Sequence, residues 1–162
     1  MIGVTPLVDG GTRPAKAVID ETFTVTATVF REGHDAVNAS VVLTDPDGVD
    51  HLTPMTCTNP GLNTWAAEVT PTRAGWWTYR VEGWSDPYGT WDHDATIKVE
   101  AGVDVELMLE EGARVLERAV AQWGLDDGGA REILTDAVTA LRHTDRPALA
   151  RLRAGTSDGV RA

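Results

Sequence analysis

Residues 22–30 read Thr-Phe-Thr-Val-Thr-Ala-Thr-Val-Phe, in which threonine and apolar side chains alternate as far as Val29. Side chains of a strand alternate between the two faces of a sheet, so this period of two predicts a half-buried strand. The next five residues, 31–35, read Arg-Glu-Gly-His-Asp, which is a denser set of charged groups than an ordinary turn requires. The cluster is therefore either a fragment of an active site or a turn that docks on another surface.

Similar short runs, separated by turn residues, continue to about residue 101. Asp45-Pro46-Asp47-Gly48 and Asn59-Pro60-Gly61 combine a proline, which presets φ, with a glycine, which accepts a left-handed conformation. The expected strands cover residues 4–8, 16–19, 22–30, 36–44, 52–58, 64–70, 76–84 and 95–100. Strands at this spacing predict an immunoglobulin- or fibronectin-III-like β-sandwich over residues 1–101.

From residue 102 the pattern changes to that of amphipathic helices. Apolar or small residues recur at intervals of three and four along one face of the first expected helix: Val105, Leu109, Gly112, Leu116, Ala119 and Trp123. A second helix is expected to end near Leu141, and a third has Pro147 in its first turn. The fold class is thus mainly β with a C-terminal α region, divided into residues 1–101 and residues 102–162, the latter holding two to three helices.

Two paired helices leave much of each apolar stripe in water. The stripe is therefore expected to pack on the sandwich, on a second copy of the chain or on a further segment. Leu109, Leu116 and Trp123 are the candidates for a dimer interface. The last residues do not complete the bundle, which suggests that the chain is a piece of a longer protein.

The formal net charge of −11 argues against nucleic acid and anionic membrane surfaces as partners. Basic residues dominate from Arg142 onward, and this end is expected to be solvated and poorly ordered. Cys57 is the single cysteine, so an intrachain disulfide is excluded. From the residues at its start, no signal peptide is expected, and no apolar run approaches membrane-spanning length, so a cytoplasmic setting is expected.

Glu32, His34 and Asp35 have the chemistry of acid–base catalysis. Catalysis by such a pair needs a nucleophile or a substrate pocket beside it, and the neighbouring sequence supplies neither. A structural turn is the favoured interpretation, with Gly33 at positive φ and Arg31 paired to a carboxylate.

A metal site is not expected. Asp92-His93-Asp94 offers two oxygens and one nitrogen, but in the strand expected here the histidine points away from the two carboxylates. His51 and His143 stand without obvious co-ligands. No cofactor is predicted.

Tryptophan occurs six times and admits two interpretations. An exposed indole can stack on the apolar face of a sugar ring, whereas a buried one packs a core. Trp77, Trp84, Tyr88 and Trp91 are the candidates for a sugar platform, although a core or domain-interface role is favoured for any single tryptophan. Trp76 and Trp77 are adjacent, so one is expected to face inward and the other outward.

The chain resembles the amino-terminal part of the bacterial maltosyltransferases that extend α-glucans from maltose 1-phosphate, which belong to the α-amylase clan. The motifs that carry the resemblance lie in the right order over nearly the whole chain. They are residues 13–18 (RPAKAV), 29–35 (VFREGHD), 84–87 (WSDP) with Trp91, 101–102 (AG), 109–114 (LEEGAR) and 146–148 (RPA).

The resemblance implies a β-sandwich followed by an inserted helical segment that helps to form a homodimer. The implied reaction transfers a maltosyl unit from α-maltose 1-phosphate to the non-reducing end of an α-(1,4)-glucan and releases phosphate. The catalytic carboxylates would lie in a later (β/α)₈ barrel, so no catalytic residue is assigned here. The structural turn then comprises residues 31–35 with Trp84 and Asp86, and fixes strand pairing or docks the sandwich onto the barrel. Two rivals remain: a free-standing carbohydrate-binding module, and an adaptor that self-associates through its helices.

Overall fold

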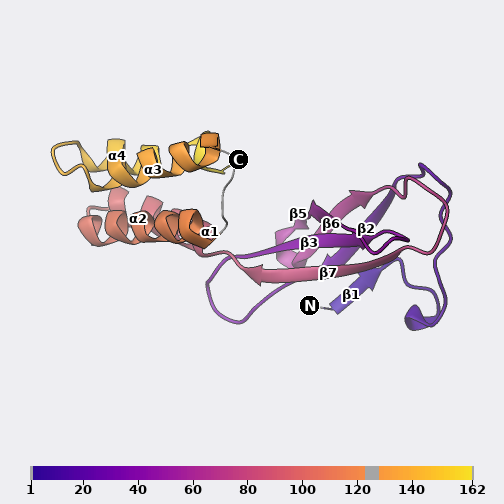
Figure 1. Cartoon of the computed structure of the whole chain (residues 1–162). Coiled ribbons are helices and arrows are strands. Elements are labelled where there is room, and N and C mark those ends of the chain that lie inside the picture. Colours follow the sequence, from indigo (N-terminus) through magenta and orange to yellow (C-terminus); the bar gives the residue numbers. More distant parts are fainter. Residues whose placement is uncertain (1, 123–127, 162) are drawn as a thin grey trace. The chain divides into compact units, whose positions relative to one another are not determined.

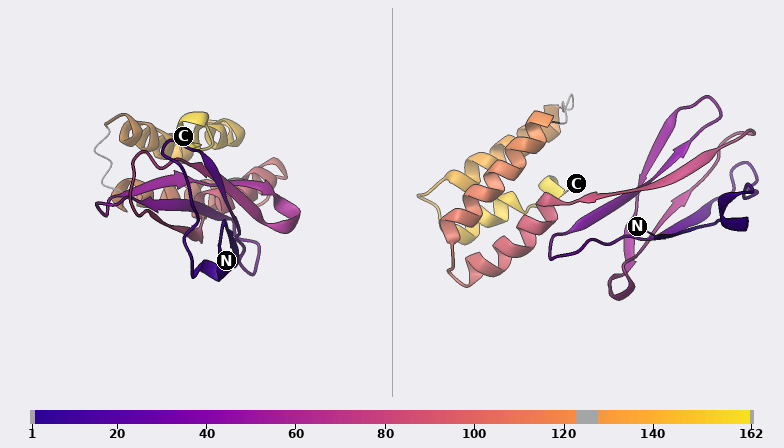
Figure 2. Two further views of the ribbon diagram at one scale, coloured as in Figure 1. Left: turned by 90° about the vertical axis from the view of Figure 1, so that its right-hand side faces the viewer. Right: turned by 90° about the horizontal axis from the view of Figure 1, so that it is seen from below.

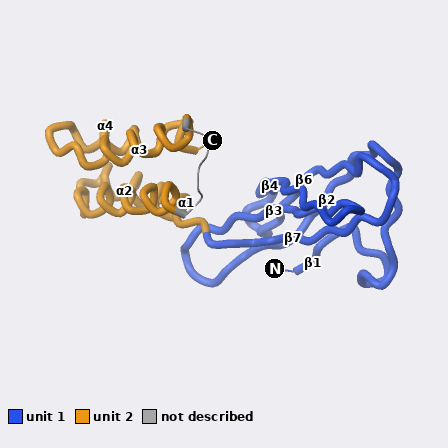
Figure 3. The backbone as a smooth tube through the Cα atoms, in the orientation of Figure 1, with its two compact units in different colours: residues 1–85 blue, residues 86–162 orange. Residues whose placement is uncertain are grey.

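A computed structural model describes residues 2–122 and 128–161 of the chain (Figure 1). Contacts divide it into two compact units, Met1–Ser85 and Asp86–Ala162 (Figure 3). The first unit holds antiparallel strands and the second holds helices. The expected fold class, mainly β with a C-terminal α region, is confirmed.

The sheet unit consists of two antiparallel sheets. Its elements are β1 (Ile2–Thr5), η1 (Asp9–Gly11), β2 (Phe23–Thr28), β3 (Val37–Thr44), β4 (Asp50–Pro54), β5 (Thr56–Asn59), η2 (Pro60–Leu62), β6 (Thr64–Val69) and β7 (Thr78–Ser85). One sheet has the order β1-β2-β6-β5 and the other β4-β3-β7. A single core takes side chains from both sheets, so the two sheets form a sandwich.

The alternation in β2 has the predicted consequence. Val25 and Ala27 are buried at 0% and 1% exposure, and the intervening threonines lie on the other face. The hydroxyl of Thr26 lies 2.7 Å from that of Thr5 on β1, so the threonine face is used in a cross-strand hydrogen bond.

Three expected strands of the sandwich differ from the structure. The expected strand 4–8 overlaps β1 only at residues 4 and 5. Residues 16–19 form no strand, because the amide of Val18 donates to Glu21 Oε2 and no ladder partner takes its place. The expected strand 52–58 is two strands, β4 in one sheet and β5 in the other. The amide of Met55 still donates to the carbonyl of Ala39 on β3 at 2.9 Å, and the chain changes sheets directly after this buried residue.

The predicted strand at residues 95–100 is wrong: these residues end helix α1 (Pro87–Glu100). Asp86 caps this helix by accepting the amide of Gly89 at 2.8 Å, and Pro87 occupies its first turn. The apolar residues 95, 97 and 99 also satisfy a period of two. The buried set is instead Trp91, Ala95 and Val99, which are four residues apart. The two units consequently divide at Ser85/Asp86, whereas the sequence pattern placed the boundary at residue 101.

The remaining helices are α2 (Val105–Gln122), α3 (Gly128–Arg142), α4 (Ala148–Gly155) and α5 (Asp158–Arg161). Helix α2 packs against both α1 and α3, and α4 packs against α3 (Figure 2). The stripes of α2 and α3 are therefore covered within the same unit, by α1 and α4, and no second copy is needed to bury them. Ile133 on α3 is 43% exposed.

The basic end is ordered by ion pairs, which corrects the expectation of a solvated tail. Arg151 has a side chain only 4% exposed; it donates to the carbonyl of Leu141 and makes a two-point contact with Glu106 at 2.7 and 2.9 Å. This guanidinium joins α4 to α2 and to the end of α3. Arg142 bridges Glu110 and Glu117 of α2, and holds the pKa of Glu110 down at about 2.

Gly112 is the position where α1 approaches α2 most tightly. A Cβ there would overlap the indole of Trp91, whose Nε1 donates to the carbonyl of Met108 at 2.6 Å. The absence of a side chain at residue 112 thus makes room for the largest side chain of the helical core.

Gly112→Ala is expected to lower the free energy of unfolding of the helical unit by about 1–3 kcal/mol, the usual cost of overpacking. At an exposed helical site the same change would stabilise by about 1 kcal/mol, so the expected sign is opposite to that of helix propensity. Urea unfolding followed by far-ultraviolet circular dichroism measures it. Gly159→Ala is the matched control, since its Cβ would meet Ile133 at an ordinary 3.6 Å. An unchanged midpoint for Gly112→Ala would contradict the packing argument.

Candidate functional site

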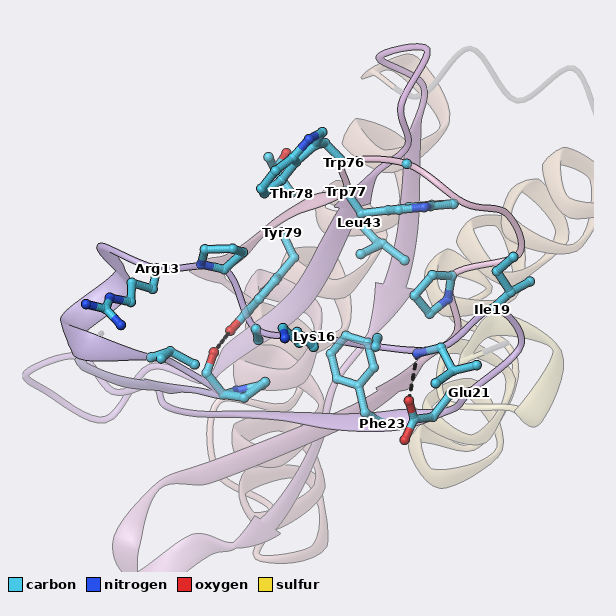
Figure 4. Close-up of a pocket in the computed structure, with 18 of the residues that line it drawn as sticks. Arg13, Lys16, Ile19, Glu21, Phe23, Leu43, Trp76, Trp77, Thr78 and Tyr79 are labelled. Atoms are coloured by element: carbon cyan, nitrogen blue, oxygen red, sulfur yellow. Dashed lines mark hydrogen bonds between the residues drawn. The ribbon is translucent and has the colours of Figure 1, made fainter.

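A cavity of about 940 Å³ in the sheet unit lies between the segment 6–21 and the segment 71–79. We call it the tryptophan groove. Its lining residues are Val4, Pro6, Leu7, Val8, Gly11, Arg13, Pro14, Ala15, Lys16, Ala17, Val18, Ile19, Glu21, Phe23, Leu43, Pro71, Arg73, Ala74, Gly75, Trp76, Trp77, Thr78 and Tyr79. Figure 4 shows Trp76 and Trp77 on one side, and Lys16 and Phe23 on the other. The volume lies in the range of small-molecule sites.

Hydrogen bonds at both ends hold the 6–21 wall, although most of it is outside any regular element. The hydroxyl of Tyr79 donates to the carbonyl of Pro6, as the dashed line in Figure 4 marks. Arg13 pairs with Asp9 at 3.0 Å across the η1 turn. At the far end the amide of Asp20 donates to the carbonyl of Pro71 at 2.8 Å. The groove therefore has a wall that is tied to β7 and to the segment after β6.

The 71–79 wall depends on Asp45, in the turn after β3. Its side chain is only 10% exposed and lies 2.7 Å from Arg73 Nη2. The amides of Val49 and Asp47 donate to the same carboxylate, each at 2.9 Å. The carbonyl of Arg73 accepts the indole N–H of Trp77 at 3.0 Å. Asp45 therefore holds Arg73, and Arg73 holds the indole of Trp77.

The electrostatics of this wall follow from those contacts. The Val49 amide is the largest cause that lowers the pKa of Asp45 from 3.8 to about 2, and Asp47, His51 and Arg73 act in the same direction. Hydrogen bonding to Asp47 raises the pKa of Arg73 above its usual value. At neutral pH both groups are therefore charged.

The groove is lined by three cations, of which Arg13 is paired with Asp9 and Arg73 with Asp45 and Asp47. Residues 1–85 contain ten acidic and five basic side chains, and three of the basic ones, Arg13, Lys16 and Arg73, line the groove. Glu21 is the one carboxylate among the lining residues, all of which the structure describes. Its Oε2 accepts the amide of Val18 at 2.8 Å, so it serves the wall itself.

A second, smaller cavity of about 530 Å³ lies on the helical unit. Asp136 and His143 are among its lining residues, with Arg146 and Ser157. No hydrogen bond or ion pair joins Asp136 to His143 in the part of the chain that the structure describes. An acid–base pair is thus not assembled there.

The sequence-predicted turn is present at residues 31–35. Gly33 has φ +102°, and Arg31 lies 3.2 Å from Asp35. Arg31 also donates to the hydroxyl of Ser85, the last residue of β7, at 2.6 Å. Glu32 and His34 are exposed. These contacts tie the turn to the adjoining sheet, and its docking role stays a prediction.

The structure separates the four candidate residues of the sugar platform. Trp91 is 5% exposed and belongs to the helical core. The hydroxyl of Tyr88 donates to the carbonyl of Gly155 at 3.1 Å, and burial raises its pKa. Trp84 is 44% exposed on β7, and Trp77 packs partly against the sandwich core. Of these four, Trp77 alone lines the tryptophan groove.

Sequence reasoning did not choose Trp76, which is 76% exposed, although the adjacency of Trp76 and Trp77 indicated one inward and one outward ring. Arg13 and Lys16 lie in the motif at residues 13–18, which was used above only as evidence of family resemblance. Residues of both walls of the tryptophan groove therefore stood out in the sequence. What joins them is the fold, since about sixty residues separate them in the chain.

The candidate dimer residues lie inside the helical unit. Leu109 and Leu116 are 0% and 2% exposed and form part of its core, so they are not available at its surface. Trp123 lies outside the described residues. Asp86 caps α1, as described above.

The Asp92-His93-Asp94 segment lies on α1 and not on a strand, which corrects the geometry expected for it. Asp92 pairs with Arg161 at 2.8 Å. Within residues 2–122 and 128–161, no group of three or more potential ligands is close enough to hold a metal ion.

Within the same ranges no helix has the length and hydropathy to cross a bilayer.

Fold and site together define the class: a β-sandwich unit and a helical unit in one chain, in which neither of the cavities described above is lined by more than one carboxylate. The sequence model of a family described as α-1,4-glucan:maltose-1-phosphate maltosyltransferase, domain N/S, matches residues 1–162. The chain belongs to this family.

Curated relatives carry the same description. Maltosyltransferase 2 of Streptomyces coelicolor is 53% identical over 160 residues, which are 98% of this chain and 24% of the relative. Maltosyltransferase 1 of that organism is 52% identical over 164 residues, 100% of this chain and 24% of the relative. The enzyme of Arcanobacterium haemolyticum is 42% identical over 164 residues, 100% of this chain and 23% of the relative. The chain thus spans about a quarter of the length of these relatives.

Asp45 is expected to make the stability of the sheet unit depend on pH. Its pKa is lowered by folding from 3.8 to about 2, so the stability it contributes is present above about pH 4 and is lost as pH falls toward 2. Thermal melts at a series of pH values measure the effect. Asp45→Asn should show a smaller fall in melting temperature over this range than the parent chain.

Asp47→Asn is the control, because it removes a 69% exposed carboxylate that also contacts Arg73. If Asp45→Asn and the parent chain lost stability in parallel down to pH 2, the assignment of the low pKa to Asp45 would be wrong.

Proposed function

We propose that this chain is the non-catalytic amino-terminal scaffold of an enzyme that elongates an α-(1,4)-glucan. The enzyme transfers a maltosyl unit from α-maltose 1-phosphate to the non-reducing end of the glucan and releases phosphate. The observation that carries the proposal is the family match over residues 1–162, combined with a coverage of 24% of the Streptomyces coelicolor relatives.

The chemistry of such a transfer supports a scaffold role. A retaining glycosyl transfer uses two carboxyl groups about 5–5.5 Å apart, one as nucleophile and one as acid and base. Glu21 is the single carboxylate lining the tryptophan groove, and Asp136 is the single one lining the helical cavity, whose lining residues are all described. We therefore assign the catalytic pair to the part of the enzyme that this chain does not cover.

The helical unit supplies the surface for self-association in this proposal. Ile97, Val103 and Leu107 are 55%, 50% and 53% exposed, and they are close in sequence across the junction of α1 and α2. Exposed apolar side chains of this kind are candidates for an interface. These three residues take the place of Leu109 and Leu116 as candidates for the interface, because Leu109 and Leu116 are buried in the core.

The turn at residues 31–35 supplies a docking element toward the catalytic part. Arg31 and Asp35 hold the turn, and the exposed side chains of Glu32 and His34 are left for a partner surface. A cytoplasmic setting is part of the same proposal, and the free thiol of Cys57 accords with it.

The structure argues against the rival interpretation as a carbohydrate-binding module. That interpretation requires an exposed platform made of Trp77, Trp84, Tyr88 and Trp91. Trp91 is buried, and Tyr88 is bound to Gly155. Sugar binding by these four residues is not favoured.

The isolated chain is expected to release no phosphate from α-maltose 1-phosphate, with or without maltooligosaccharide as acceptor. A colorimetric phosphate assay measures this, and the full-length enzyme that contains the chain is the positive control. Phosphate release that scales with the concentration of the purified chain would contradict a non-catalytic role.

Leu107→Asp is expected to lower the average mass of the chain in multi-angle light scattering, because it places a carboxylate in the proposed interface. The side chain is already 53% exposed, so the monomer should keep its fold. Leu62→Asp, at a 66% exposed leucine of the sheet unit, is the matched control and should leave the mass unchanged. Equal masses for the parent chain and Leu107→Asp would remove this surface from the proposal.

A further inference from the structure

We infer that the tryptophan groove is a non-catalytic binding site for an α-(1,4)-glucan chain. The choice of glucan as ligand rests on the proposed function. The existence of a ligand site rests on the groove itself.

The first observation is the exposed indole. Trp76 is 76% exposed, whereas its neighbour Trp77 is held by a hydrogen bond to Arg73 and packs partly on the core. Leaving an indole in water forgoes one of the largest gains in burial that a side chain offers. The fold of the sheet unit does not account for this position, and a ligand that covers the ring would.

The second observation is what surrounds the indole. Leu7, Val18 and Ile19 on the facing wall are 54%, 70% and 50% exposed, and they lie in the same groove as Trp76. Apolar surface gathered in a cavity of about 940 Å³ is typical of a ligand site and not of scattered surface residues. The volume is at the upper end of the usual range, which suits an oligomer better than a single ring.

The third observation is the set of polar groups. Lys16 lies in the groove, and no hydrogen bond or ion pair of its ammonium is recorded among the described residues. Arg13 and Thr78 add further donors at the lining. A sugar chain matches this combination, because its C–H faces suit the negative face of an indole while its hydroxyls accept from cations.

An apolar peptide segment fits the groove less well. It would take the Lys16 ammonium out of water, and its apolar side chains would offer that ammonium no hydrogen-bond acceptor. A glucan keeps that ammonium hydrogen-bonded. The groove would then hold a polymer near the enzyme without taking part in bond cleavage or formation.

Isothermal titration calorimetry of the 162-residue chain with maltoheptaose tests the inference. We expect saturable binding, a weakening of about tenfold in Trp76→Ala, and a smaller weakening in Lys16→Met. Trp84→Ala removes an exposed indole of the same unit outside the groove, and should bind like the parent chain. Cellohexaose, the β-linked probe, should bind more weakly. Trp76 is exposed, so Trp76→Ala should unfold at the same urea concentration as the parent chain.

Absence of binding at millimolar maltoheptaose would overturn the inference, as would equal binding by the parent chain and Trp76→Ala. A lower melting temperature of the full-length enzyme upon Trp76→Ala, without sugar binding by the chain, would instead identify the groove as a docking surface for the rest of the enzyme. Maltosyl transfer is measured separately on the full-length enzyme. Failure of transfer with intact maltoheptaose binding would reject the proposed function alone.

Discussion

The helical unit depends on the contact that α1 makes with α2. Asp86 and Pro87 end the last strand and start a helix, and that helix carries Trp91 to Gly112. The missing Cβ of Gly112 admits the indole, and the Met108 carbonyl satisfies its N–H. Without α1, the apolar stripe of α2 would lose the packing of Trp91, Ala95 and Val99 and keep only that of α3 and α4. One glycine and one cap thus turn a helical hairpin into a packed bundle.

The sheet unit has a comparable centre in Asp45. Its carboxylate accepts two amides of its own turn and pairs with Arg73, so one nearly buried charge orders both a turn and a wall of the tryptophan groove. A buried carboxylate is costly unless its lone pairs are occupied, and here they are. The contact with Arg73 therefore links the turn after β3 to the 71–79 wall of the groove.

The chain matches the domain N/S family over residues 1–162 and spans about a quarter of the length of its relatives. These two facts support the scaffold role proposed above. The exposure of the Trp76 indole is not explained by the stability of the sheet unit. An exposed apolar patch of this kind marks a binding surface, and the lining of the tryptophan groove indicates which ligand would cover it.

The sequence by itself determined the sandwich, the helices from Val105 onward and the family, because period two, period 3.6 and a contiguous motif are local properties. It also determined that Gly33 has positive φ. The tertiary structure alone decided that residues 95–100 are helical, since the alternation there fits both periods and only contact with α2 selects one. It decided equally that Leu109 is core and Trp76 is surface. Burial is a property of what packs against a side chain, and those partners lie far away in the sequence.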